Sequence, residues 1–173
     1  MTHVKDNVIL VDENNREIGV EEKLKAHEKG ILHRAFSIFV FNSKKELLIQ
    51  QRAKEKYHCP EIWANTCCSH PRPNETYEQA IHRRLKEEMG FDCELKKSFC
   101  FIYRAKFPNG LIENEYDCVF MGESDAIPNP NLKEVMDYKW ISLEDLEKDI
   151  KQNPSKYSIW FKIALNKMEY NIK

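Results

Sequence analysis

The sequence predicts a single α+β domain, in which a mixed β-sheet core is flanked by helices. Short apolar runs of strand length recur along the chain, and segments rich in helix formers lie between them. Two pairs of apolar runs are joined by short turns, as in β-hairpins. No repeat, low-complexity tract or linker interrupts the 173 residues, so residues 1–173 are expected to fold as one domain.

The composition is that of an ordinary globular protein. Apolar residues make up 42% of the chain and charged residues 32%, which excludes a disordered or fibrous protein. The formal net charge of −1 gives no reason to expect binding to nucleic acid or to an anionic membrane surface. No apolar run approaches the ~20 residues of a transmembrane span, and the first residues lack the apolar core of a signal peptide. We therefore expect a cytoplasmic protein with no membrane partner.

The first half of the chain contains several strands and one helix. Gly30 can end the helix, because glycine readily adopts the left-handed conformation found at helix ends. A turn of Asn-Ser-Lys-Lys predicts that two of the strands form a hairpin. The expected elements are, in order, a strand at 8–11, a helix over 21–29, a hairpin of 35–41 and 46–52, a basic loop at 53–60 and an extended segment at 65–71.

The second half contains three helices around another hairpin. Asn74 and Ser142 can each cap a helix that follows, and Pro154 suits the first turn of a third. The sequence Phe-Pro-Asn-Gly contains a strong hairpin turn signal. The expected elements are a helix over 75–89 ended by Gly90, a hairpin of 100–106 and 111–121, a strand at 138–141, a helix near 143–152 and a last helix from Pro154 to about Lys167.

A thiol and an imidazole stand two residues apart in the extended segment, which reads Asn-Thr-Cys-Cys-Ser-His-Pro. Because side chains alternate along a strand, Cys68 and His70 are expected on one face, where a nucleophilic or acidic sulfur and a metal-binding nitrogen would share a pocket wall. Cys67 then points to the other face. A chain without an export signal is expected to keep its six cysteines reduced, so no disulfide is predicted. Structural roles are expected for Cys59, Cys67, Cys93, Cys100 and Cys118.

The helix predicted over 75–89 carries charges on its apolar side. Ile81 and Leu85 lie on the stripe that packs inward, together with Tyr77. Arg84 and Glu88 project to that same side, within roughly 20° of Tyr77. One interpretation is an ion pair between residues four apart at the edge of the stripe. The other is that Glu88 faces a cavity that holds a cation.

Three histidines and two glutamates are candidates for a metal site. Glu113 and Glu115 are two residues apart on a predicted strand and therefore share a face. Nitrogen and oxygen ligands together suit Mn²⁺ or Zn²⁺ better than Ca²⁺. The imidazole candidates are His27, His33 and His70, whereas surface or structural roles are expected for His3, His58 and His82.

The segment Arg-Arg-Leu-Lys-Glu-Glu-Met-Gly-Phe at 83–91, with Glu75 before it, resembles the Nudix box. In that motif a loop and a helix hold divalent metal against a diphosphate. This sequence departs from the box at two positions, because Ser69 replaces its opening glycine and Arg84 replaces a glutamate of the hydrolytic metal cluster. The resemblance therefore implies a Nudix-type fold and diphosphate binding. The departure at Arg84 argues against hydrolysis, because it removes a ligand of the hydrolytic metal cluster.

The chain as a whole resembles the type I isopentenyl diphosphate isomerases, which are built on a Nudix core. The resemblance rests on Leu-His-Arg-Ala-Phe-Ser at 32–37, Trp-Ala-Asn-Thr-Cys-Cys-Ser-His-Pro at 63–71, the modified box, Glu-Asn-Glu at 113–115 and Trp160. The interval between His27 and His33 is one residue shorter than expected for bacterial members. The resemblance implies one metal site for Mn²⁺ or Zn²⁺, with the ligands His27, His33, His70, Glu113 and Glu115, and a Mg²⁺ ion held on the diphosphate by Glu88.

The resemblance also implies the reaction and its groups. The enzyme would interconvert isopentenyl diphosphate and dimethylallyl diphosphate in isoprenoid biosynthesis, by adding a proton at one carbon and removing one at another. Cys68 and Glu115 would face each other across the C5 diphosphate, with Tyr103 beside the glutamate. Trp160 would offer its π face to a carbocation, although a core aromatic is the other interpretation of this residue. The cations expected to bind the diphosphate are Lys23, Arg52, Lys56 and Arg84.

Two other functions remain open from the sequence. A Nudix hydrolase of a nucleotide or prenyl diphosphate would release phosphate or a monophosphate, and Arg84 speaks against it. A non-catalytic, metal-stabilised interaction module would bind metal without turnover. The protein is expected to act on a small molecule as a monomer or a homodimer.

Overall fold

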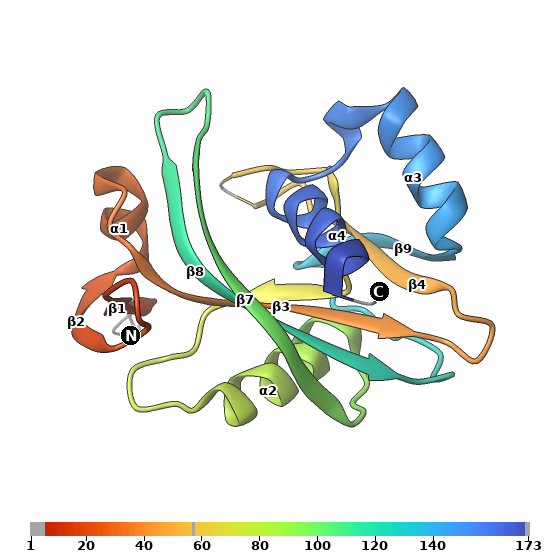
Figure 1. Cartoon of the computed structure of the whole chain (residues 1–173), viewed down its shortest axis with the longest axis horizontal. Helices are drawn as coiled ribbons and strands as arrows, with labels where there is room; N and C mark the ends of the chain where they lie inside the picture. The colour runs from red at the N-terminus through yellow and green to blue at the C-terminus, as the bar shows by residue number, and fades with distance from the viewer. Residues whose placement is uncertain (1–5, 57, 172–173) are drawn as a thin grey trace.

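Helices cover both faces of a mixed sheet in the computed structural model, which describes residues 6–56 and 58–171, the last three of them by their backbone alone. One helix, α2 (Tyr77–Met89), lies on one face, and two others, α3 (Leu143–Gln152) and α4 (Ile159–Asn171), lie on the opposite face (Figure 1). A short helix, α1 (Lys23–Lys29), lies at one end of the molecule beside the first two strands. The expected layers of sheet and flanking helices are confirmed.

Within the described residues the strands form one nine-stranded sheet. They are β1 (Asn7–Val11), β2 (Glu17–Glu22), β3 (His33–Phe41), β4 (Leu47–Arg52), β5 (Trp63–Ala64), β6 (Cys67–Ser69), β7 (Leu95–Lys106), β8 (Ile112–Glu123) and β9 (Val135–Ile141). A short 3₁₀ helix, Pro154–Lys156, precedes α4. None of the helices in the described part of the chain is both long and apolar enough to cross a bilayer.

Strand β3 is the centre of the sheet. It runs parallel to β8 from the pair His33 and Glu115 to the pair Phe41 and Glu123, and antiparallel to β6, where Ser37 faces Cys68. The side chains of β3 are mostly buried on both faces of the sheet, as expected for a central strand. The parallel pairing brings together two segments that are about 80 positions apart in the sequence.

The predicted hairpin of β3 and β4 is confirmed, but its pairing is short. The two strands pair only at Phe41 and Leu47, next to the turn, and β4 then pairs along its length with β9. The side chain of Thr66 lies between the separated strands, where its Oγ1 accepts from Val40 N and donates to Leu48 O. The strands therefore diverge beyond the turn.

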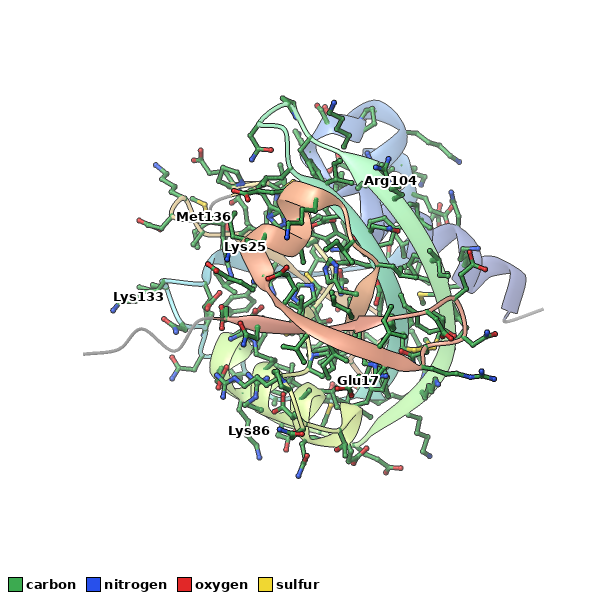
Figure 2. The ribbon with its side chains drawn as sticks, turned by 90° about the vertical axis from the view of Figure 1, so that its left-hand side faces the viewer. Glu17, Lys25, Lys86, Arg104, Lys133 and Met136 are labelled. Atoms are coloured by element: carbon green, nitrogen blue, oxygen red, sulfur yellow. A yellow bond between two sulfur atoms is a disulfide. The ribbon has the colours of Figure 1, made fainter. Side chains whose placement is uncertain are left out.

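The two faces of the sheet have separate cores. On one face Ile81, Leu85 and Met89 of α2 pack on Phe36 and Ile38. On the other face Phe161 of α4 packs on Phe39 and Leu47. Residues of odd number in β3 and β8 face α4, and their even-numbered neighbours face α2. Figure 2 shows the charged side chains that surround these cores, with Lys86 at the outer surface of α2.

Three helix starts differ from the expectation. Helix α1 begins at Lys23, because residues 17–22 pair with β1 as β2. Helix α2 is capped by Thr76 and not by Asn74, since Thr76 and Gln79 form a reciprocal capping box. Pro154 begins only the 3₁₀ turn, and the last helix starts at Ile159. The predicted ends at Gly30 and Gly90 and the cap at Ser142 are confirmed.

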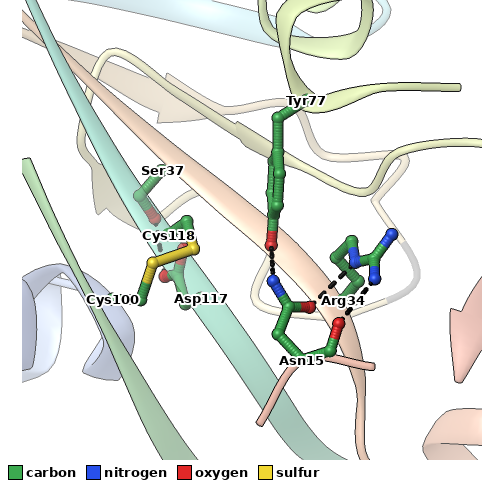
Figure 3. Close-up of a disulfide and its surroundings, with 7 residues drawn as sticks. All are labelled: Asn15, Arg34, Ser37, Tyr77, Cys100, Asp117 and Cys118. Atoms are coloured by element: carbon green, nitrogen blue, oxygen red, sulfur yellow. Dashed lines mark hydrogen bonds between the residues drawn. A yellow bond between two sulfur atoms is a disulfide. The ribbon is translucent and has the colours of Figure 1, made fainter. Parts of the chain in front are cut away.

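The expectation that all six cysteines are reduced is wrong for one pair. Cys100 on β7 and Cys118 on β8 are directly opposite in the antiparallel register and form a disulfide (Figure 3). Their Cα atoms are 4.1 Å apart, so the hairpin brings the two sulfurs together. The disulfide lies on the α2 face of the sheet, whereas Cys59, Cys67, Cys68 and Cys93 are free.

Candidate active site

Four predicted metal ligands meet at the N-terminal end of β3. His33 begins that strand, His27 comes from α1, His70 follows β6, and Glu115 lies opposite His33 on β8. One ligand atom of each lies within 4.8 Å of the others. The short interval between His27 and His33 therefore does not prevent His27 from joining the cluster, because Gly30 ends α1 and turns the chain back into β3.

The hydrogen bonds of these histidines leave ring nitrogens available to bind a cation. His27 Nδ1 and His33 Nδ1 donate to the carbonyls of Lys23 and Ile31, at 2.6 and 2.8 Å. In the neutral rings Nε2 then carries a lone pair, as in metal-binding histidines that donate their other N–H to a carbonyl. His33 Nε2 lies 3.5 Å from Glu115 Oε1, and His70 Nε2 lies 2.9 Å from the same oxygen. Acceptor atoms this close repel one another unless a proton or a metal ion lies between them.

Burial keeps the imidazoles in the form that binds metal. It lowers the pKa of His27, and it lowers the pKa of His70 to about 3. Neutral imidazole is the ligand form of histidine, so these rings are ready to bind without losing a proton at neutral pH. The cluster can hold a divalent ion, and its mixture of nitrogen and oxygen donors is typical of Mn²⁺ and Zn²⁺ sites.

The second predicted carboxylate, Glu113, lies beside the four-residue cluster and not within it. It groups with His27 and His58, and its Oε1 lies 2.5 Å from His58 Nε2. Tyr103 O–H lies 2.6 Å from Glu113 Oε2 and also 2.6 Å from Glu115 Oε2. A phenol has one hydrogen to donate, so one of the two carboxyl groups must supply the proton of the other contact.

The protonation of the two glutamates differs. Burial and the adjacent Glu115 carboxylate raise the pKa of Glu113 well above its usual value. Burial alone would also raise the pKa of Glu115, but without an ion a proton lies between the carboxylate and the His33 and His70 rings, and these hydrogen bonds hold the pKa of Glu115 well below its usual range. These directions favour a proton on Glu113 and a Tyr103 O–H that points at ionised Glu115.

A small cavity of about 80 Å³ opens beside this cluster. Cys68 and Trp160 line it together with Tyr103, Glu113 and Glu115. Burial raises the pKa of the Cys68 thiol to about 12, so the thiol keeps its proton at neutral pH. Cys67 packs on the other face among the residues of α2, as the strand alternation predicted.

The four predicted phosphate-binding cations line the same cavity. They come from separate elements, and they are Lys23, Arg52, Lys56 and Arg84. A more open cleft of about 300 Å³ adjoins the cavity, shares Lys23, Lys56 and Arg84 with it, and adds Arg72, Arg83 and Lys133. The site therefore has a small inner chamber and a basic mouth.

Glu88 and Arg84 form the ion pair that was one of the two interpretations of the helix sequence. Glu88 is buried, and besides Arg84 it accepts a hydrogen bond from Gln50 Nε2 at 2.9 Å. Both residues also line the cavity, so the pair faces the place where a ligand would lie. Arg84 makes further ion pairs with Glu87 at 2.8 Å and with Glu134 at 3.6 Å.

Two residues of the site were missed from the sequence. His58 is buried, lines the cavity and contacts Glu113. Glu134 forms an ion pair with Lys56 as well as with Arg84. Both stand in irregular segments, where no periodicity shows which way a side chain points. The only available signal for His58 was its place between Lys56 and Trp63, in the loop that leads to the extended segment.

Comparison with known proteins places the chain in a family. Residues 31–161 match the NUDIX domain model. The chain is 52% identical over 165 residues to isopentenyl-diphosphate Delta-isomerase 2 of Aromatoleum aromaticum, covering 95% of this chain and 87% of that one. It is 53% identical over 163 residues to isopentenyl-diphosphate Delta-isomerase 2 of Photorhabdus laumondii, covering 94% and 92%.

Solved structures agree on the fold. A protein from Deinococcus radiodurans superposes with a TM-score of 0.76 at 21% identity, covering 93% of this chain and 98% of that chain. A MutT protein from Methanosarcina mazei superposes with a TM-score of 0.68 at 17% identity, covering 82% and 96%. At these identities the likeness concerns the fold alone. With its two faces of helices, its altered Nudix helix and its close curated relatives, the chain belongs to the NUDIX superfamily and, within it, to the isopentenyl-diphosphate Delta-isomerases.

Proposed function

We propose that this chain interconverts isopentenyl diphosphate and dimethylallyl diphosphate by moving one proton onto the C5 chain and another off it. The observation that carries the proposal is the inner chamber, where a protonated thiol, Cys68, and an ionised carboxylate, Glu115, line one small cavity with Trp160. Relatives that are more than 50% identical carry the name of this isomerase.

The inner chamber suits the reacting end of the substrate. Proton addition to an unactivated alkene produces a tertiary carbocation, which water would quench. The chamber is small, and Trp160 is 3% exposed, so its ring can offer a desolvated π face worth about 2 kcal/mol or more to a cation. One group must hold a proton and another must accept one, and the resting states of Cys68 and Glu115 meet that need.

The basic mouth suits the diphosphate. Arg52 and Arg84 bring guanidinium charges to the place where phosphate oxygens would lie, and Lys23 and Lys56 add point charges. The proposal includes a Mg²⁺ ion on the diphosphate beside Glu88, a carboxylate that lines the cavity near these cations. The alkene would then point toward Cys68, away from the open cleft.

The histidine cluster would hold a second divalent ion. His27, His33, His70 and Glu115 are its ligands in this proposal, with Glu113 adjoining them and Mn²⁺ or Zn²⁺ as the ion. The ion would supply positive charge that sets the acidity of Glu115. The residues that line the cavity are spread along the chain, from Lys23 near its start to Trp160 near its end. We therefore propose that residues 1–173 form one catalytic domain, and that one copy of the chain supplies the whole active site.

The compartment follows from the chemistry. The proposed reaction needs Cys68 as a free thiol, which the reducing cytosol preserves, whereas the Cys100–Cys118 disulfide lies in the α2-side core. We therefore propose a cytoplasmic location.

Product analysis tests the function. Purified protein with Mg²⁺ and Mn²⁺ is incubated with isopentenyl diphosphate, and the expected product is an acid-labile allylic diphosphate with no release of phosphate. Release of phosphate or of a monophosphate would instead identify a Nudix hydrolase. The ion pairs of Arg84 with Glu87 and Glu88 argue against hydrolysis, because they place a fixed cation among carboxylates of the Nudix helix.

A further inference from the structure

His58 touches three groups of the proposed active site. Its Nε2 lies 2.5 Å from Glu113 Oε1, and its Nδ1 lies 3.2 Å from Arg52 Nη2. Its ring stacks on Trp160, with 6.1 Å between the centroids and 24° between the planes. The side chain is 8% exposed, so these contacts are shielded from bulk water.

A metal-ligand role is the first alternative. His27, His58 and Glu113 place ligand atoms within 4.8 Å of one another. However, a guanidinium has donors only, so His58 Nδ1 must accept from Arg52. The single proton of the neutral ring is then on Nε2, which therefore donates to Glu113 and has no lone pair for an ion. In this arrangement the imidazole is a donor and not a ligand.

Arg52 also contacts several groups of the site. Its Nε donates to Cys59 O at 2.9 Å and its Nη2 to His58 O at 3.1 Å, and its guanidinium lies over the Trp160 ring at 5.3 Å from the centroid. The loop that follows β4 therefore fixes the cation, the imidazole and the indole against one another. The opposite edge of His58 then meets Glu113.

We propose that His58 is a positioning residue, which transmits the placement of the diphosphate-binding Arg52 to the carboxyl group of Glu113 beside the metal cluster. Arg52 fixes the tautomer of His58, and that tautomer gives Glu113 its donor. The other oxygen of Glu113 contacts Tyr103, which contacts Glu115, so the effect reaches a reacting group through hydrogen bonds. The inference deepens the proposed function and rests on it for the roles of Arg52 and Glu115.

Two substitutions separate the parts of this role. His58→Gln keeps an N–H that can reach Glu113, whereas His58→Phe keeps only a ring for Trp160. His82→Ala is the matched control, because His82 lies on the outer part of α2, where it bonds to Asp92 at 2.6 Å. The affinity for Mn²⁺ is measured from the free-ion electron paramagnetic resonance signal, and kcat and KM are measured with isopentenyl diphosphate.

The expected pattern is rescue by glutamine. His58→Phe should weaken Mn²⁺ binding and lower kcat, each by about tenfold or more, as is typical when a hydrogen-bonding residue behind the ligands of a metal site is lost. His58→Gln should return both values to within about threefold of the wild type, and His82→Ala should change neither. If His58→Phe does not fold, His58→Leu replaces it, because leucine also lacks a hydrogen-bonding atom.

Equal losses in His58→Gln and His58→Phe would overturn the inference, because an N–H that reaches Glu113 would then not restore the site. No loss in either variant would overturn it as well. If the variants show the expected pattern of Mn²⁺ affinities but the wild-type protein does not isomerise isopentenyl diphosphate, the proposed function is refuted and the positioning role of His58 stands.

Discussion

Single side chains determine which proton each group holds in the site. Cys68 keeps its proton because it is buried, and Glu115 loses its proton because imidazoles surround it. Tyr103 joins the two glutamates through one oxygen. Each of these states follows from a particular contact, so each can be tested by a single substitution.

Tyr103→Phe removes only the oxygen that joins Glu113 and Glu115. A hydrogen bond to an ionised group is worth about 1.5–3 kcal/mol, so we expect kcat for isomerisation to fall by roughly 10- to 100-fold. Steady-state kinetics with isopentenyl diphosphate measures the change. Tyr116→Phe is the control, because Tyr116 lies on the same hairpin and faces the α2 core. Equal losses in the two variants would show that the effect comes from the hairpin and not from the glutamates.

At the scale of elements, strand alternation accounts for most of the site. It correctly separated Cys68 from Cys67 and placed Glu113 and Glu115 on one face. Those inferences need only a local repeat of two residues. The parallel pairing of β3 with β8 could not be predicted in the same way, because it joins distant segments through no turn. His58 was missed for a related reason, since an irregular loop has no repeat.

The disulfide depends on the register of the second hairpin, which its turn fixes. Phe107 and Leu111 close that turn, and counting back from them along both strands pairs Cys100 with Cys118. The sequence alone did not give this register, because the Asn-Gly turn signal does not show that Phe107 pairs with Leu111. The disulfide was therefore not predicted, and the expectation that cytoplasmic thiols stay reduced also spoke against it.

The loop before α2 is fixed to the helix by a double ion pair. Arg83 Nε and Nη2 donate to the two oxygens of Glu75 at 2.6 and 2.7 Å, and Glu75 also accepts from Arg72 N at 2.8 Å. The hydrogen bond from Arg83 lowers the pKa of Glu75 below its usual value of 4.5. A lowered pKa in the folded state stabilises the fold above the unfolded-state pKa, and the stabilisation is lost as the pH falls through the folded-state value.

Glu75→Gln should therefore reduce the free energy of unfolding at pH 7 by about 1 kcal/mol, a modest effect because solvent partly screens the pair. The difference from wild type should shrink as the pH falls below 4.5. Urea denaturation at several pH values measures it. Glu94→Gln is the control, because Glu94 is 79% exposed and pairs with an exposed Lys96. A difference that grew at low pH would contradict this account.

At the scale of the whole molecule, the metal cluster joins parts of the chain that are far apart. His27 comes from α1, His70 follows β6 and Glu115 lies on β8, so an ion there would link three elements around β3. Such an ion binds the folded chain only, and it therefore stabilises the fold by mass action.

Removal of metal with a chelator should lower the melting temperature, and Mn²⁺ or Zn²⁺ should restore it. At a free-ion concentration 100 times Kd the gain is about 2.7 kcal/mol. Calorimetry measures the shift. His33→Gln should abolish the response to metal, and His82→Ala, on the outer part of α2, should retain it. No response of the wild-type protein to either ion would refute the metal site.

The central claim is that Cys68 faces the alkene and transfers a proton, whereas its neighbour Cys67 serves only the core. Cys68→Ala and Cys67→Ala remove the same atoms at adjacent positions on opposite faces of β6. The most direct measurement is kcat for conversion of isopentenyl diphosphate by the two variants side by side. We predict a loss of at least about 10²-fold for Cys68→Ala, since general acid–base groups contribute 10²- to 10⁴-fold, and a loss of no more than about threefold for Cys67→Ala, with a lower melting temperature from the small void it leaves. Activity retained in Cys68→Ala, or lost equally in both variants, would contradict the account.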